Sequence, residues 1–145
     1  MIRRLYIGDI EVLTKEENHV EICAVVNGVG YEVLVTKRSF KTISKALKDN
    51  SSGPYPIETF HRITETAEML YGFSSKREYE LFTMFLEVQG VGAKTGLSLV
   101  QTLTLSQVKK AIRDSDLSCF KSVNGVGPST SQKILESLKS QFTKK

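Results

Sequence analysis

A short glycine-containing phrase occurs three times in this chain, and two of the copies lie in matching surroundings. VNGVG occupies residues 26–30 and again 123–127, and VQGVG occupies residues 88–92. The first copy separates two segments in which apolar and polar residues alternate. Each of the other two lies between segments with apolar residues at helical spacing. One phrase therefore predicts a turn between strands once and a turn between helices twice.

Charge and length suggest two small domains. The chain has 145 residues and a net charge of +4. Residues 1–74 carry 9 Lys and Arg against 10 Asp and Glu, a net of −1, whereas residues 75–145 carry 11 against 6, a net of +5. A basic half joined to a neutral half is typical of a protein that faces a polyanion, although an ordinary basic surface gives the same count.

The first half has the pattern of a small β-barrel. Residues 19–25 and 31–35 alternate as half-buried strands do, and Asn27 and Gly28 between them suit a tight hairpin turn. Further candidate strands are residues 3–13, 57–63 and 67–73, the last two separated by Thr64, Glu65 and Thr66. Residues 39–47 fit a short helix or a curved strand, and residues 48–56 read as a loop. This number of short strands favours an OB-fold barrel, with other small barrels left open.

The second half has the pattern of an all-α domain. Candidate helices cover residues 75–88, a segment around Leu97 and Val100, residues 104–114, residues 116–123, and a last helix with Ile134, Leu138 and Phe142 on one face. Two pairs are candidate capping boxes: Ser75 with Glu78, and Thr104 with Gln107. We place the barrel in residues 1–66 and the helical domain in residues 67–145.

The two later glycine phrases each join two of these helices, which is the helix-hairpin-helix pattern. Paired glycines let the backbone approach a ligand, and the first amides of the next helix point outward without partners. A phosphate oxygen satisfies such amides and meets the positive end of the helix dipole. The pattern predicts binding to a DNA backbone without base readout, with a helical bundle or a protein-contact tandem as the alternatives. The candidate DNA-binding residues are Gly90, Val91, Gly92, Ala93, Lys94 and Thr95 in the first hairpin, and Gly125, Val126, Gly127, Ser129, Thr130 and Lys133 in the second.

Several other kinds of site are not expected. GVGAKT is not a P-loop, because Val88 stands where that motif needs glycine. We find no catalytic set, no acidic cluster of a metal-dependent nuclease, and no ligand spacing around Cys23, Cys119, His19 or His61, so no metal or cofactor is expected. Without a long apolar run or a signal peptide, a cytoplasmic protein that contacts no membrane is expected. We expect the basic residues Lys109, Lys110 and Arg113 to form a solvated helix face.

Taken in order, a small barrel followed by tandem hairpins resembles the RuvA family of bacterial Holliday-junction-binding proteins. The resemblance covers essentially the whole chain. It rests on the start MI-RL, NGVGYEV at residues 27–33, LYGF at residues 70–73, ELF at residues 80–82 and the NGVG-type hairpins. It implies a non-catalytic subunit that binds four-way DNA in a structure-selective way during homologous recombination and repair.

The resemblance also implies an assembly and partners. It implies a homotetramer, or an octamer of two tetramers face to face, with the barrels near the centre of an open junction. A third domain beyond a flexible linker docks the hexameric ATPase RuvB in the family, and this sequence ends at QFTKK, before such a domain. A junction resolvase is a further candidate partner.

Two departures from the family pattern bear on the site. The family places two neighbouring acids between the last two barrel strands, where they repel phosphates at the junction centre. Glu65 matches the first acid of this pin, but Thr66 stands at the second. The second hairpin has Pro128 and Ser129 where the family has two lysines, which should weaken binding and flatten its salt dependence.

Two hypotheses from other classes stay open at this point. Tandem hairpins also occur in the non-catalytic parts of repair nucleases and ligases, although LYGF after an amino-terminal barrel speaks against these. The reduced charge of the second hairpin also leaves room for an interaction module that has lost DNA binding.

Overall fold

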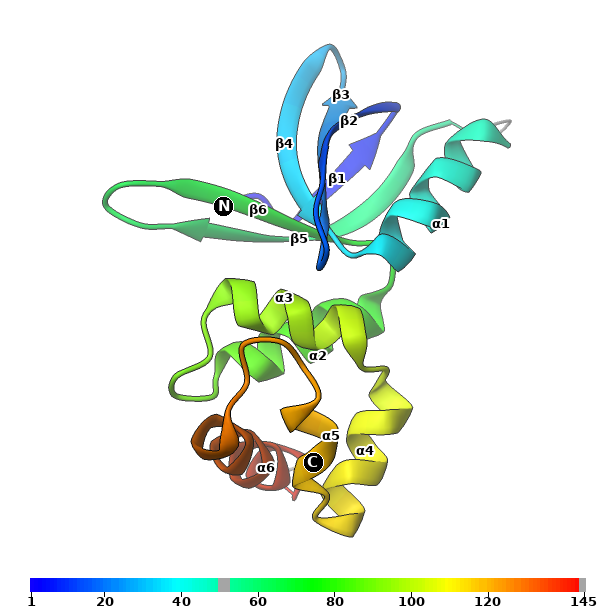
Figure 1. Ribbon diagram of the computed structural model, residues 1–145. Helices are drawn as coiled ribbons and strands as arrows, with labels where there is room; N and C mark the ends of the chain where they lie inside the picture. Colours follow the sequence, from blue (N-terminus) through cyan, green and yellow to red (C-terminus); the bar gives the residue numbers. More distant parts are fainter. Residues whose placement is uncertain (50–52, 144–145) are drawn as a thin grey trace. The chain divides into compact units, whose positions relative to one another are not determined.

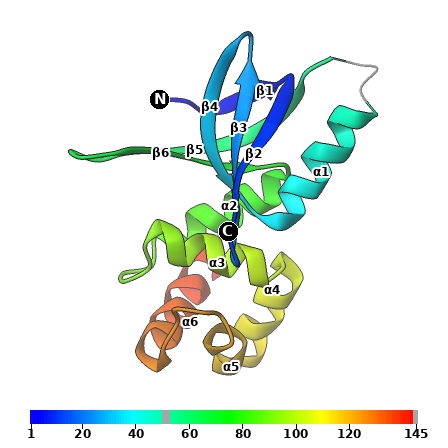
Figure 2. The same ribbon diagram turned by 45° about the horizontal axis from the view of Figure 1, so that its top comes forward.

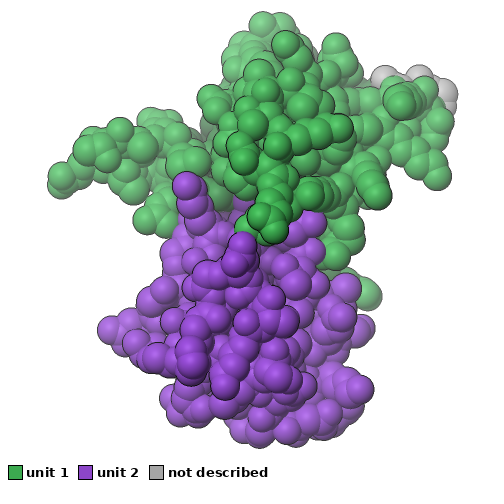
Figure 3. All heavy atoms as spheres, viewed as in Figure 1, with its two compact units in different colours: residues 1–79 green, residues 80–145 purple. Residues whose placement is uncertain are grey.

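The computed structural model describes residues 1–49 and 53–143, and the chain forms two compact units. The first unit spans Met1–Tyr79 and the second spans Glu80–Lys145 (Figure 3). Within the described residues, all strands lie in the first unit, whereas the second unit is helical.

Six strands of the first unit form one strongly curved sheet (Figure 1). The strand order is β1-β5-β6-β4-β3-β2, and every pair is antiparallel except β4 with β6. Their bounds are β1 Arg4–Ile7, β2 Asp9–Lys15, β3 Val20–Val26, β4 Val29–Val35, β5 Tyr55–Ile63 and β6 Glu68–Phe73.

The two edge strands of this sheet are consecutive in the chain, and this continuity closes the barrel. Only Gly8 separates β1 from β2, and its amide donates a hydrogen bond to the carbonyl oxygen of Val25 in β3 at 2.9 Å. One bent strand thus pairs with β5 at one end and with β3 at the other. This is the Greek-key closure of an OB-fold, as predicted.

The barrel core follows the predicted alternation. Ile22 and Ala24 of β3 are fully buried, and they pack with Val33 of β4 and Ile57 of β5. Between β3 and β4, Asn27 and Gly28 have φ angles of 49° and 81°, the left-handed values of a type I′ turn. The first VNGVG phrase is therefore the predicted turn between strands.

Residues 39–47, for which the sequence left a short helix or a curved strand open, lie in a helix, α1, Lys37–Lys48. The Thr36 hydroxyl caps it by accepting a hydrogen bond from the Ser39 amide at 3.1 Å. Ile43 is fully buried in the barrel core, with Phe40 and Leu47 partly buried beside it. Of the loop predicted at residues 48–56, residues 50–52 lie outside the described part of the chain, and β5 begins at Tyr55.

The observed division differs from the predicted boundary after residue 66. Strand β6 pairs with both β4 and β5, so the sheet continues past that point. Helix α2, Lys76–Leu86, begins in the first unit and continues into the second. The hydrophobic pattern of residues 67–73 predicted the strand, whereas the boundary depends on how that strand pairs.

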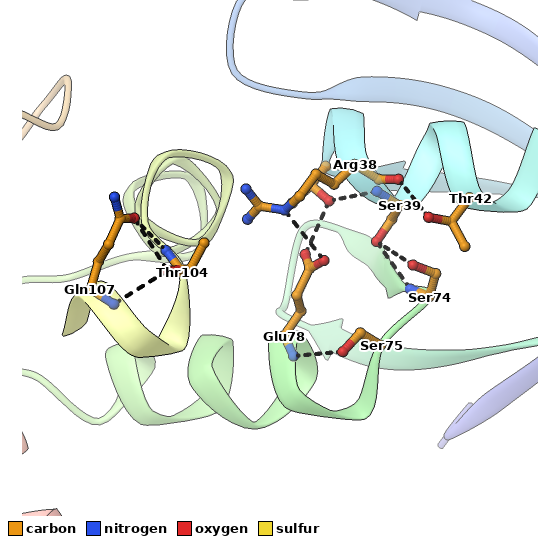
Figure 4. Close-up of polar contacts among 9 residues, drawn as sticks. Arg38, Ser39, Thr42, Ser74, Ser75, Glu78, Thr104 and Gln107 are labelled. Carbon is orange, nitrogen blue, oxygen red and sulfur yellow. Dashed lines mark hydrogen bonds and ion pairs between the residues drawn. The ribbon is translucent and has the colours of Figure 1, made fainter. Parts of the chain in front are cut away.

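Of the two hydrogen bonds in the capping box predicted at the start of α2, one forms (Figure 4). The Ser75 hydroxyl accepts a hydrogen bond from the Glu78 amide at 3.4 Å. The Glu78 carboxylate instead accepts one from the Thr36 hydroxyl at 3.2 Å and lies 3.8 Å from Arg38. Burial raises the pKa of Glu78, and the Arg38 charge and the hydrogen bonds from Thr36 and Arg38 counter this only in part.

The helices of the second unit pack against one another (Figure 2). Their buried side chains form an apolar core. The remaining helices are α3 Ala93–Thr102, α4 Leu105–Asp114, α5 Leu117–Lys121 and α6 Pro128–Thr143. The capping box of Thr104 and Gln107 at the start of α4 is fully formed, as predicted. Fully buried core residues include Phe82, Phe85, Leu99, Val108, Phe120, Ile134 and Leu138. The predicted fold class, an OB-fold barrel followed by an all-α tandem helix-hairpin-helix domain, is confirmed.

Two kinds of feature are absent from the described residues. No helix among them has the length and apolar character needed to cross a membrane. The same residues contain no group of three or more His, Cys, Asp or Glu that could hold a metal ion.

Candidate nucleic-acid interface

Two hairpins of the second unit have the same backbone geometry, offset by 35 residues. Gly90 lies between α2 and α3 with φ 92°, and Gly125 lies between α5 and α6 with φ 88°. After each glycine, a valine amide donates a hydrogen bond three residues back at 3.1 Å: Val91 to Val88, and Val126 to Val123. The repeated phrase therefore gives a repeated structure, in which glycine takes a left-handed conformation that other residues rarely adopt.

The valines of both hairpins face inward. Val91 is 7% exposed and Val126 is 8% exposed, and Val88 and Val123 before them are also buried. These side chains anchor each turn to the helices that it joins. They leave the glycine backbone on the outside, as predicted.

The outer side of both turns is open. A Cβ atom added to Gly90, Gly92 or Gly127 would meet no atom within 4 Å, apart from the adjoining backbone. A Cβ added to Gly125 would meet only the Thr95 hydroxyl, at 3.9 Å. The two hairpins are therefore neighbours, and a ligand can approach the backbone of either.

Each turn leads into a helix whose first amides have no intrahelical partner. The first hydrogen bond within α3 runs from the Gly96 amide to the Gly92 carbonyl oxygen at 2.8 Å. The first within α6 runs from the Ser131 amide to the Gly127 carbonyl oxygen at 2.9 Å. The amides of residues 93–95 and of residues 129–130 precede these bonds. Gly92 provides no side-chain cap, whereas Thr104 and Asp116 cap α4 and α5. The two helices after the hairpins thus present amides suited to an anion.

Polar side chains surround these amides unequally. In the first hairpin Lys94 is exposed and Thr95 is partly buried, while Ala93 is buried against the core. The 35-residue offset matches Lys94 to Ser129, which is exposed and uncharged. Among the residues that the structure describes, Lys94 forms no ion pair. The first hairpin therefore carries a cation that the second lacks at the same position.

The second hairpin has its own cation one turn later. Thr130 is partly buried near the start of α6, and Lys133 is exposed and corresponds by the offset to the buried Ser98 of α3. Pro128 occupies the first helical position, where proline is well tolerated because its missing amide would have had no partner.

One structural pair was not singled out from the sequence. Gly96 and Ser131 occupy the same position of the repeat, four residues after the second glycine. A Cβ on Gly96 would lie 3.3 Å from Phe82 and from Leu86, so a small residue lets α3 approach α2. Ser131 is fully buried, and its hydroxyl donates to the Gly127 carbonyl at 2.8 Å. In the sequence, a small residue recurs four positions after the second glycine of each hairpin, and this recurrence could have pointed to the pair.

Comparison with known proteins agrees with this geometry. A family model described as a SAM-like helix-hairpin-helix tandem matches residues 82–140. The RuvA subunit of the Holliday junction branch migration complex from Pseudomonas entomophila is 32% identical over 136 residues, which cover 94% of this chain and 64% of that protein. The same subunit from Crocosphaera subtropica is 31% identical over 143 residues, covering 99% of this chain and 66% of the relative.

The chain belongs to the RuvA family. Similarity of this extent includes both the barrel and the hairpins, so it does not rest on the hairpin motif alone. The chain spans just under two thirds of the length of the RuvA relatives that it matches.

The remaining site prediction, the acidic pin at Glu65, concerns the hairpin of β5 and β6. It extends from the barrel as a two-stranded arm (Figure 1), and Glu65 and Thr66 lie at its exposed tip. Thr64 closes the turn, with its amide donating to the Ala67 carbonyl at 2.8 Å and its hydroxyl accepting from the Ala67 amide at 3.1 Å. Glu68 is not free at the tip, because its carboxylate lies 3.2 Å from His61 on the neighbouring strand. The tip therefore presents one acid, Glu65.

The basic residues of α4 behave as an ordinary helix surface. Lys109, Lys110 and Arg113 are exposed, and Arg113 pairs with Asp114 at 3.5 Å. This arrangement fits the predicted solvated face. We do not include these residues in the interface.

Proposed function

We propose that this chain binds four-way junction DNA by structure rather than by sequence, as the RuvA-like, non-catalytic subunit of a branch migration complex. The role belongs to homologous recombination and DNA repair. The observation that carries the proposal is the matched pair of hairpins, each of which leads unpartnered helix amides to an open surface. Paired sites of this kind bind phosphates of a backbone and ignore base identity.

Each hairpin contributes a phosphate site built mainly from backbone. In the first, we assign the phosphate contacts to the amides of residues 92–95, with Lys94 and the Thr95 hydroxyl as side-chain donors. In the second, the contacts come from the amides of residues 127, 129 and 130, with the hydroxyls of Ser129 and Thr130, and Lys133 reaches the same strand. Val91 and Val126 hold the turns in place from inside.

The arm of β5 and β6 acts at the centre of the junction. We propose that Glu65 repels phosphates there and helps keep the strands apart. With Thr66 beside it, a tetramer carries four such acids in place of eight. Strand separation is then weaker than in relatives with both acids, while binding through the hairpins is unaffected.

The proposed assembly and partners are those that the resemblance to the RuvA family implies. We propose a homotetramer, or an octamer of two tetramers, that presents its hairpins to the arms of one junction. A hexameric RuvB-like ATPase is the proposed motor partner, and a junction resolvase is a further partner.

A gel-shift titration against a four-way junction and a linear duplex of equal length tests the proposal. We expect the junction to bind about 100-fold more tightly, a difference of ~2.7 kcal/mol. Equal affinity for both DNAs would reduce the protein to a general DNA-backbone binder. Absence of binding at low salt would favour an interaction module that has lost DNA binding.

A further inference from the structure

A shallow pocket lies on the outer face of the barrel, where β1 pairs with β5 and α2 begins. Its volume is about 340 Å³, and its lining includes Arg4, Tyr6, Tyr55, Glu58 and Lys76. All of these residues belong to the first unit, so the pocket is separate from the hairpins. Its volume is within the range of small-molecule sites.

Tyr6 gives this pocket an exposed aromatic surface. The neighbours of Tyr6 in β1, Leu5 and Ile7, are buried in the barrel core, whereas Tyr6 alternates outward and is 52% exposed. A nucleic-acid base can stack on an exposed aromatic ring of an OB-fold surface, and such stacking does not depend on which base it is.

The charges around the ring favour an anion. Glu58 is the one acid in the lining, and it accepts hydrogen bonds from both Arg3 and Arg4, the latter at 2.8 Å. Burial alone would raise the pKa of Glu58, but these two arginines lower it. Lys76 is exposed at the first position of α2 and forms no ion pair within the described residues. The two cations of the lining, Arg4 and Lys76, thus outweigh its one carboxylate.

We propose that this pocket binds one nucleotide of a single-stranded nucleic acid, with the base stacked on Tyr6 and the phosphate at Lys76. A base and a phosphate are the two groups that this lining matches, because an aromatic ring and an uncompensated cation lie at one depression. The inference goes beyond the proposed function, in which the hairpins bind the backbone of duplex arms. It gives the barrel a contact with unpaired strand.

Photocrosslinking tests the site directly. An oligothymidylate of about twelve nucleotides, within the site size of an OB-fold, carries one 5-iodouracil, and the crosslinked peptide is identified by mass spectrometry. We expect the crosslink at Tyr6. Tyr6→Ala should remove it and weaken binding of the oligonucleotide about tenfold, the loss typical of one stacked base.

Matched variants separate stacking and charge from general effects. Tyr6→Phe keeps the ring and should bind like the unaltered chain. Lys76→Ala should weaken binding several-fold, whereas Lys41→Ala, which removes an exposed lysine of α1 outside the pocket, should not. Circular dichroism confirms that each variant is folded before its affinity is compared.

The outcomes distinguish this proposal from the one on the hairpins. Crosslinks confined to residues 90–95 or 125–130 would overturn the pocket and leave junction binding intact. A crosslink at Tyr6 without preference for four-way DNA would support the pocket and overturn junction selectivity. Tyr6→Ala that changes the mass of the assembly but not the affinity for oligothymidylate would identify Tyr6 as a contact between copies of the chain, and would overturn the nucleotide site.

Discussion

At the scale of single residues, the glycines of the hairpins have two separate tasks. Gly90 and Gly125 are needed for their φ angles of 92° and 88°. Gly92 has an ordinary φ of −87° and could be replaced without backbone strain. What Gly92 contributes is the open space above the first amides of α3, into which a Cβ would project.

Substitution by alanine is expected to separate these two tasks. Gly90→Ala should lower the free energy of unfolding by about 1 kcal/mol or more, because a Cβ disfavours the left-handed conformation. Gly92→Ala should change stability little and yet weaken DNA binding about tenfold, or ~1.4 kcal/mol, since its methyl group stands where the phosphate approaches. Urea unfolding and a junction titration of both variants measure this. Full junction affinity in folded Gly92→Ala would contradict the proposed contact.

Glu78 is a residue whose charge costs stability at neutral pH. Because its folded pKa is raised by burial above the ordinary value of 4.5, the fold favours the protonated form. That contribution is present below pH 4.5 and is lost as the pH rises through the higher folded pKa. We therefore expect Glu78→Gln to be more stable than the unaltered chain at pH 7, with the advantage disappearing in acid below pH 4.5. Chemical unfolding at several pH values checks this, and a variant less stable at pH 7 would show that the contacts with Arg38 and Thr36 outweigh burial.

At the scale of elements, the 35-residue repeat makes the two hairpins a built-in comparison. Their turns and buried valines match, and so do their first helix amides except at Pro128, which has none. Their cations do not match, since Lys94 corresponds to Ser129. Affinity and its salt dependence should therefore come unequally from the two hairpins. The first hairpin is expected to contribute more of the electrostatic part.

Ser129→Lys is expected to restore the missing charge. Position 129 is exposed near the start of α6, and lysine there would repeat the placement of Lys94. The slope of log affinity against log salt should steepen by about 0.9, and Lys94→Ala should flatten it by the same amount. Lys109→Ala serves as the control and should leave the slope unchanged. Equal slopes in all four proteins would mean that neither hairpin position meets a phosphate.

The elements also show what sequence patterns reveal and where they stop. The strand of residues 67–73 and the turns at Asn27 and Gly90 follow from alternation and glycine chemistry, which are local. Whether residues 39–47 formed a helix depended on burial of Ile43 under the barrel, which is a tertiary contact. Likewise, Glu78 completes no capping box because Thr36, distant in the sequence, attracts its carboxylate. That Tyr6 lines a pocket could not be predicted from the sequence, because it depends on the register of β1 against β5.

At the scale of the whole molecule, the proposed function depends on several copies of the chain acting together. A single chain offers two hairpins and one acidic tip, whereas a four-way junction has four arms around one centre. The proposed tetramer supplies this symmetry, with an arm for each subunit. Selectivity for junctions over duplex should therefore depend on assembly more than on any single contact.

The mass in solution tests this dependence. Light scattering coupled to size exclusion is expected to give four times the chain mass of 16.2 kDa, or eight times for two tetramers. Adding junction DNA should not dissociate the assembly. A monomer that still prefers four-way DNA would contradict the view that symmetry gives the selectivity.

The most direct test of the account is rapid hydrogen exchange of the first amides of α3 and α6, with and without four-way DNA. In the free protein these amides have no intrahelical partner and should exchange quickly. On binding, we predict that residues 93–95 and 129–130 are both protected, while the Thr104-capped start of α4 does not change. Junction binding without protection at either hairpin would contradict the claim that the repeated glycine turns bind the DNA backbone.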